Sequence, residues 1–186
     1  MISQKEIDFY SKKYNKTVCA ILDSNSRFYS FNGGIKWCFD WDPDPRIVAT
    51  CNRDKAIITI NIEAFLISLR EDNLKTIEYY LLHEIRHIYQ HICIHEYTSN
   101  KKDEKNEYVE KWIEEEKHYV KSLNANGEEN PEYFMQDMEM DAYAYSFAVM
   151  KYKYKDSYSP YVPKIYGDQF FQIVNDWMIF FAKNNL

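Results

Sequence analysis

Residues 75–95, KTIEYYLLHEIRHIYQHICIH, contain the strongest structural signal in this chain. Apolar side chains recur there every three or four residues, the period of one face of an α-helix. The positions are Ile77, Leu81, Ile85, Ile88 and Ile92. This spacing predicts a long helix over about 75–95. Because the pattern His-Glu-x-x-His lies inside this stretch, its side chains belong to a helix face and not to a loop.

The pattern consists of His83, Glu84 and His87, with Ile85 and Arg86 between the last two. Residues four apart lie one turn apart on the same face of a helix, so both imidazoles can bind one tetrahedral metal ion, about 2.0–2.1 Å from each nitrogen. The glutamate that follows the first histidine can take a proton from water at such an ion without binding the ion itself. A chain of this composition would produce the pattern by chance roughly 0.01 times, which favours a metal site over coincidental histidines.

Two further histidines, His91 and His95, continue the four-residue spacing. Each step of four residues rotates about 40° beyond a full turn, so the four histidines cannot converge on one ion. We expect His91 and His95 to lie on the surface or beside the ligands, and their role stays open.

A catalytic zinc ion usually has three protein ligands, so a third ligand must come from elsewhere in the chain. Residues 139–146, EMDAYAYS, offer Glu139 on a second predicted helix at about 132–153. Ala142 and Ser146 share the face of Glu139, and small residues there allow two helices to approach closely. Asp137 and Asp141 are alternatives. Asp141 points about 200° away from Glu139, so these two cannot both be ligands.

The rest of the pattern predicts an α+β protein with a strand-rich front half and a helical back half. Ser3 and Glu6 form a capping-box pattern before a helix at 4–15. Apolar runs and turn residues predict a strand at 17–22 and hairpins at 28–41 and 47–62. In the second hairpin Ile58, Ile60 and Ile62 share one face. Helical spacing returns in a short helix after residue 63 and in a terminal helix around residues 170–181.

Residues 101–131 form a charged insertion between the two helices that carry the predicted ligands. Residues 101–117 hold five Lys and seven Asp or Glu. Val109, Trp112, Ile113 and Val120 nevertheless make an apolar stripe, which predicts an amphipathic helix at about 107–122 followed by a loop at 124–131. We expect the stripe to pack on the domain. Whether the insertion is a lid over a cleft or a structural buttress stays open.

Composition limits the class of protein. The chain has 186 residues, which favours a single domain over 1–186, and a net charge of -6 without the basic excess of a nucleic-acid binder. No apolar stretch is long enough to span a membrane, and the start lacks the apolar core of a signal peptide, so we expect a cytoplasmic protein. Four cysteines without a Cys-x-x-Cys pair are expected to be reduced, buried side chains: Cys19, Cys38, Cys51 and Cys93.

Residues 82–90 (LHEIRHIYQ) together with residues 139–145 (EMDAYAY) resemble the small intracellular zincin metallopeptidases of bacteria and their mobile elements. These peptidases have the gluzincin arrangement, His-Glu-x-x-His on one helix and Glu-x-(Glu/Asp)-Ala on another. The resemblance covers about 56–150. It implies a zincin-like fold in which a small N-terminal twisted sheet lies beside the active-site helix, with an edge strand at about 56–62 along the substrate cleft.

The resemblance also implies roles for individual residues. His83, His87 and Glu139 would bind Zn²⁺, and Glu84 would be the general base. Independently of the resemblance, we expect Asp141 to lie beside the ligands or to replace Glu139 as a ligand. Many relatives carry Asp or Asn four residues after the third ligand, where this chain has Tyr143.

The expected function is therefore that of a zinc-dependent metallopeptidase that hydrolyses an intracellular protein or peptide, with no nucleic-acid or membrane partner. The alternative is a catalytically silent zincin-fold module that binds other proteins. Substrate specificity, oligomeric state and the residue that stabilises the oxyanion are left open.

Overall fold

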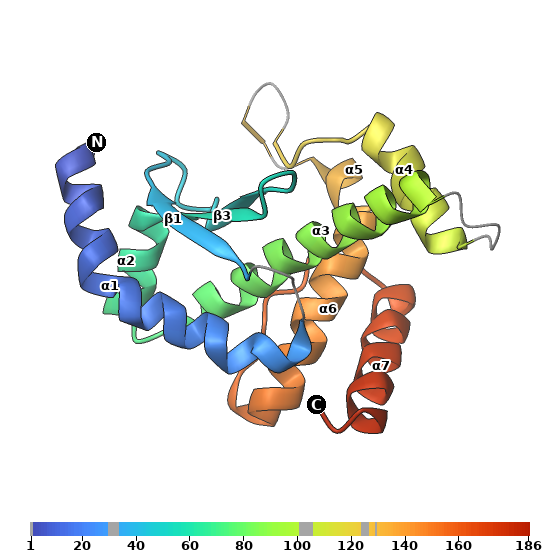
Figure 1. The fold of residues 1–186 in the computed structure, drawn as a ribbon. Coiled ribbons are helices and arrows are strands. Elements are labelled where there is room, and N and C mark those ends of the chain that lie inside the picture. The colour runs from blue at the N-terminus through green and yellow to red at the C-terminus, as the bar shows by residue number, and fades with distance from the viewer. Residues whose placement is uncertain (1, 30–33, 101–105, 124–126, 129) are drawn as a thin grey trace. The chain divides into compact units, whose positions relative to one another are not determined.

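The computed structural model describes residues 2–29, 34–100, 106–123, 127–128 and 130–186. Over these residues it has seven α-helices and three β-strands, which confirms the predicted α+β class. The chain divides into two compact units, residues 1–88 with Leu186 and residues 89–185. One helix, α3 (Leu74–Asn100), runs through both (Figure 1). The single domain with an inserted segment stays a prediction.

The first unit contains a three-stranded mixed sheet in the order β1-β3-β2. Strand β2 (Ala49–Asn52) and strand β3 (Ile57–Asn61) pair antiparallel and form the predicted second hairpin. Strand β1 (Lys36–Asp40) pairs parallel with β3, so β3 is the central strand. The expectation that residues 56–62 form an edge strand is therefore wrong. A strand with one apolar face is typical of either position, and only the pairing of distant segments decides between them.

The core of this unit lies on the predicted face of β3. Ile58 and Ile60 are fully buried, and Phe39 of β1 lies beside Ile60 in the register. The ring centroid of Phe39 is 5.0 Å from that of Phe65 on α2 (Ile62–Arg70), the short helix that the sequence predicted. Asn61 caps α2, because its Oδ1 accepts a hydrogen bond from the amide of Glu63 at 3.1 Å.

Helix α1 (Gln4–Asn25) begins with the predicted capping box of Ser3 and Glu6 but extends ten residues beyond the predicted end at residue 15. The strand expected at 17–22 is therefore wrong. Val18 and Leu22 are both buried, four residues apart, as on one face of a helix. No Gly or Pro separates this apolar run from the preceding helix, so the helix continues through it.

The predicted first hairpin is also wrong in its main feature. Its expected first strand begins at Phe28, which instead lies in the 3₁₀ helix η1 (Ser26–Phe28). Residues 30–33, which include half of that strand and most of the turn, lie outside the described residues. The second strand of the hairpin exists as β1, but its partner is the distant strand β3.

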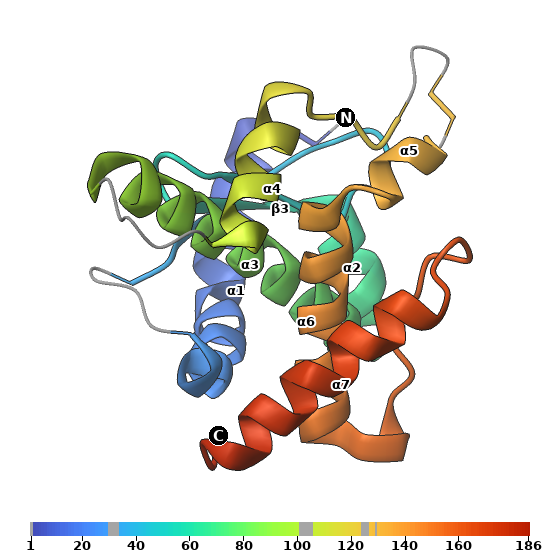
Figure 2. The same ribbon diagram turned by 90° about the vertical axis from the view of Figure 1, so that its right-hand side faces the viewer.

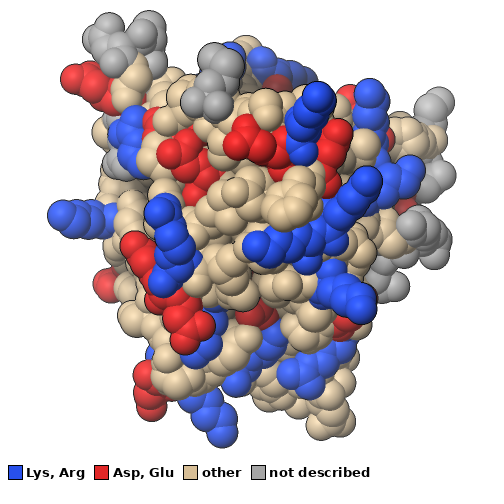
Figure 3. All heavy atoms as spheres, turned by 90° about the vertical axis from the view of Figure 1, so that its left-hand side faces the viewer, with Lys and Arg blue, Asp and Glu red and all other residues tan. Residues whose placement is uncertain are grey.

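The face of the molecule shown in Figure 3 carries both signs of charge. Blue Lys and Arg side chains lie among red Asp and Glu side chains on this face.

The second unit is helical. Besides the second half of α3 it contains α4 (Glu107–Lys117), α5 (Pro131–Phe134), α6 (Asp137–Tyr154), the 3₁₀ helix η2 (Lys155–Ser157) and α7 (Asp168–Lys183). The predicted helix at 132–153 is thus two helices, because the backbone of Gln136 is extended (φ -65°, ψ 135°). Helix α7 runs beside α6 (Figure 2), where the ring of Trp177 lies 5.1 Å from that of Tyr145.

The stripe of α4 packs as predicted, although the helix ends at Lys117 and not near residue 122. Val109 and Trp112 are buried in a cluster with Ile94 of α3 and Met138 of α6. The charged face of α4 is exposed, as expected for an amphipathic helix. Residues 124–126 and 129 of the predicted loop lie outside the described residues, so the loop over 124–131 stays a prediction.

The exposure of the cysteines and the apolar character of the helices bear on two expectations from composition. The cysteines are not buried: Cys38 is exposed, and Cys19, Cys51 and Cys93 are partly exposed. Among the described residues, no helix combines the length and apolar character needed to cross a bilayer.

Candidate metal centre

Helix α3 presents the two histidines of the motif on one face. His83 and His87 are buried, with 2% and 6% of their surfaces exposed. Their rings are nearly perpendicular, and the two Nε2 atoms are 3.0 Å apart. Two ligand atoms of one tetrahedral zinc ion, each 2.0–2.1 Å from it, lie about 3.3 Å apart. The histidine nitrogens are therefore already close to the separation that a shared ion requires.

Glu139 lies in the first turn of α6 and is fully buried. The start of this helix is held by a side chain from α4, since the carboxylate of Glu115 accepts hydrogen bonds from the amides of Asp137 (2.5 Å) and Met138 (2.9 Å). The unpaired amides and the macrodipole of a helix N-terminus stabilise negative charge. The first turn of α6 is thus a favourable place for a buried carboxylate.

Two tyrosines contact the Glu139 carboxylate. The hydroxyl of Tyr119 donates a hydrogen bond of 2.6 Å to Oε1. Tyr133 also forms a hydrogen bond with Glu139, and burial, reinforced by this carboxylate, raises the pKa of Tyr133 well above its usual range. Tyr133 is therefore protonated at neutral pH and can donate.

The three predicted ligands come together. One ligand atom each of His83, His87 and Glu139 lies within 4.8 Å of the others. In the part of the chain that the structure describes, this is the one cluster of three or more His, Cys, Asp or Glu residues of this kind. Two imidazoles and a carboxylate are a donor set that zinc takes in catalytic sites, with one position left for water or substrate. The residues present thus fit a metal ion.

The link between α3 and α6 explains how Glu139 reaches the histidines. Gln90, one turn beyond His87 on α3, donates hydrogen bonds to the backbone carbonyl of Met138 (3.0 Å) and to Oδ2 of Asp141 (2.8 Å). Gln90 is fully buried, and its amide therefore ties the first turns of α6 to a specific turn of α3. The histidines occupy the two preceding turns of that same continuous helix.

The other predicted site residues have different surroundings. Glu84 lies on α3 directly after His83 and is buried. Asp141 is not in the ligand cluster, and its carboxylate accepts from Gln90 and from the indole of Trp177 at 3.4 Å. Asp137, the third acidic candidate, is partly exposed, and its Oδ2 lies 3.5 Å from Nζ of Lys111.

Tyr143, which stands at the position where many zincins have Asp or Asn, is buried between aromatic rings. Its ring centroid lies 6.1 Å from that of Phe134 and 6.0 Å from that of Tyr166. This position of α6 therefore contributes to packing of the second unit.

The additional histidines of α3 lie outside the ligand cluster. His91 is half-buried, with Nδ1 3.4 Å from Oε1 of Glu116 on α4. His95 is exposed. Their positions agree with the expectation that they lie on the surface or beside the ligands.

Sequence reasoning missed Tyr119, Glu115 and Gln90. Gln90 is the last residue of the stretch 82–90, and its place one turn after His87 could have suggested a role in the approach of a second helix. Tyr119 and Glu115 carry no local signal, because both lie in the charged segment and reach α6 only through tertiary contacts.

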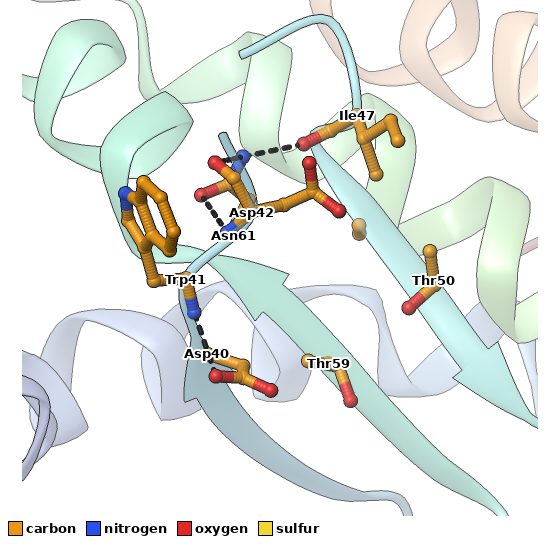
Figure 4. Close-up of a pocket in the computed structure, with 8 residues that line it drawn as sticks. Asp40, Trp41, Asp42, Ile47, Thr50, Thr59 and Asn61 are labelled. Atoms are coloured by element: carbon orange, nitrogen blue, oxygen red, sulfur yellow. Dashed lines mark hydrogen bonds between the residues drawn. The ribbon is translucent and has the colours of Figure 1, made fainter. Parts of the chain in front are cut away.

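A separate hollow of about 120 Å³ lies in the first unit, at the carboxyl ends of β1 and β3 (Figure 4). Among its lining residues, Asn61 donates to the carbonyl of Ile47 at 2.9 Å, and Asp40 accepts from the amide of Trp41 at 2.8 Å. None of the predicted metal ligands lines it. These bonds hold the loop between β1 and β2, which gives the hollow a structural explanation.

Comparison of the chain with models of known families, with curated proteins and with solved structures found no match. The fold and the site therefore define the protein only as an α+β chain with a buried group of two histidines and one glutamate that could hold a metal ion.

Proposed function

We propose that the protein is a zinc-dependent peptidase of the zincin type, acting on a protein or peptide in the cytoplasm. The observation that carries this proposal is the buried cluster of His83, His87 and Glu139, with Glu84 next to the first histidine. A coincidental His-Glu-x-x-His would have no reason to meet a buried carboxylate from a helix some fifty residues later. The resemblance to gluzincins in the two short motifs supports the same assignment.

In this proposal His83, His87 and Glu139 hold Zn²⁺. The bound ion would supply Lewis-acid chemistry, polarising the scissile carbonyl and making water easier to deprotonate. Glu84 takes the proton from the attacking water and passes it to the leaving amine, and its burial keeps this transfer away from bulk solvent. An extended substrate could pair with the outer side of an edge strand, β1 or β2, through main-chain hydrogen bonds.

The alternative is a zincin-fold module that binds other proteins without hydrolysing them. Three large apolar side chains of α7 that are about half exposed favour it. Phe171, Ile179 and Phe180 are 50%, 43% and 48% exposed. Such residues are typical of protein-binding surfaces when they form a contiguous patch.

Turnover separates the two candidates. The zinc-loaded protein is incubated with a peptide library, and cleavage is followed by mass spectrometry. Glu84→Gln should retain zinc and lose cleavage by at least about 100-fold, since general-base catalysis contributes about 10²–10⁴ in rate. Glu96→Gln, an exposed glutamate of the same helix, is the matched control and should cleave normally. Equal cleavage by Glu84→Gln and the unmodified protein would show that Glu84 is not the base, and no cleavage by either would favour the binding module.

A further inference from the structure

The segment Glu115–Val120 consists of the last three residues of α4 and the three residues that follow them. It contacts the first turn of α6 at three points. Glu115 binds the amides of Asp137 and Met138, as described above. The side chain of Gln136 accepts from the amide of Val120 (2.9 Å) and donates to its carbonyl (3.1 Å). The hydroxyl of Tyr119 donates to Oε1 of Glu139 at 2.6 Å.

These contacts act on different parts of the same turn. Glu115 holds the backbone of the turn, and the Gln136 side chain at its N-cap holds the backbone of Val120. Tyr119 holds the side chain that ends in the ligand cluster. A glutamate has three side-chain torsions, and a buried metal site needs one of its conformations in particular. A short hydrogen bond to Oε1 restricts the carboxylate and leaves it further lone pairs with which to bind an ion.

We propose that Tyr119 is a positioning residue for the metal centre, through which the segment Glu115–Val120 prepares Glu139 to bind the ion. The proposal rests on the proposed function, because it assumes that Glu139 is a ligand. It gives part of the charged insertion a role other than that of a lid: it supplies the hydrogen-bond donor that orients a metal ligand from outside. Hydrogen-bond partners of ligands commonly tune metal affinity in this way.

The test measures zinc affinity by competition with a chromophoric chelator. Tyr119→Phe keeps the ring and removes only the hydroxyl, so zinc should bind about 10–100-fold more weakly. Tyr108→Phe removes a hydroxyl from a tyrosine of the same insertion that is 72% exposed, and should leave affinity unchanged. The measurement is repeated in Tyr133→Phe, because Tyr133 also bonds to Glu139 and could compensate.

Two readouts separate positioning from a general structural effect. The absorption bands of the Co²⁺-loaded protein should shift in Tyr119→Phe even at saturating metal, since the ligand field changes when the carboxylate reorients. When Glu139 is already replaced by alanine, adding Tyr119→Phe should not weaken the residual zinc binding by the two histidines any further. The proposal would be overturned if Tyr119→Phe changed neither the Co²⁺ spectrum nor the zinc affinity, both in the otherwise unmodified protein and in Tyr133→Phe.

The unmodified protein provides an independent check if the variants fold poorly. Because linkage is reciprocal, a segment that favours metal binding must itself be stabilised by the metal. Zinc should therefore slow hydrogen exchange at the amide of Val120, which bonds to Gln136, and leave the exposed end of α7 unaffected. Zinc binding without any such protection would contradict the role of this segment. Absence of zinc binding in the unmodified protein would instead refute the proposed function.

Discussion

Replacing Trp112 by alanine should destabilise the second unit strongly. The Trp112 side chain is 5% exposed and packs with Val109, Ile94 and Met138. A tryptophan buries on the order of 200 Å², which at about 25 cal/mol per Å² corresponds to about 5 kcal/mol. Residual burial in the unfolded chain reduces this by up to about 40%. We therefore expect a loss of about 3–5 kcal/mol in the free energy of unfolding, within the usual range for Trp→Ala in a core.

Urea unfolding followed by far-ultraviolet circular dichroism measures this loss, and hydrogen exchange locates it. Exchange should accelerate in α4 and α6 and in the second half of α3, because these elements supply the cluster. Trp41→Ala is the matched control. Trp41 is only partly buried and donates one hydrogen bond to Glu63, so its loss should cost about 1–2 kcal/mol. A cost below about 1 kcal/mol for Trp112→Ala, or one no larger than that of the control, would refute this account of α4 packing.

The remaining predictions concern the metal, its third ligand and the response to pH. The protein should bind about one Zn²⁺ per chain, and His83→Ala or His87→Ala should abolish binding; elemental analysis that finds zinc retained in both variants would exclude this site. Glu139→Ala should weaken zinc binding far more than Asp141→Ala, for which about 10–100-fold is expected because Asp141 acts through Gln90; competition titration would expose the reverse order. Burial raises the pKa of Tyr29 to about 12, so the folded state favours its protonated form. The stability that Tyr29 contributes is thus complete below pH 10 and is lost as the pH rises toward 12. Tyr29→Phe removes the hydrogen bond to the carbonyl of Leu22, so it should lower the free energy of unfolding at pH 8 and reduce its decline above pH 10. Urea titrations of both proteins across this pH range measure the decline, and an equally steep decline in the variant would show that Tyr29 does not cause it.

Much of the local structure could be predicted because it depends on residues close together in the chain. The apolar period over residues 77–92 specifies α3, and the same helix geometry places His83 and His87 one turn apart. The capping box at Ser3 and Glu6 starts α1, and the turn between β2 and β3 joins neighbouring strands. In each case the interaction spans few residues, so its pattern is visible in the sequence.

Local reasoning was wrong wherever distant segments compete for the same residues. The run at 17–22 has the composition of a strand, yet Val18 and Leu22 are buried as part of α1. Strand β1 follows a turn-like Gly-Gly, yet pairs in parallel with β3. The free energy gained by burying apolar surface is roughly proportional to the buried area and does not depend on direction. It therefore stabilises a helix or a strand in the same place, and composition does not decide between them.

The candidate site divides along the same line. Its histidine pair follows from the sequence by itself, because a helix of known period fixes the separation of residues four apart. Which carboxylate faces the pair, and what orients that carboxylate, was decided only by the tertiary structure. Gln90 ties α6 to α3, Asp141 is engaged by Gln90 and Trp177, and Tyr119 meets Glu139 from a segment with no recognisable motif. Hydrogen bonds between distant segments depend on short distances and on direction, and those are set only when the helices have packed.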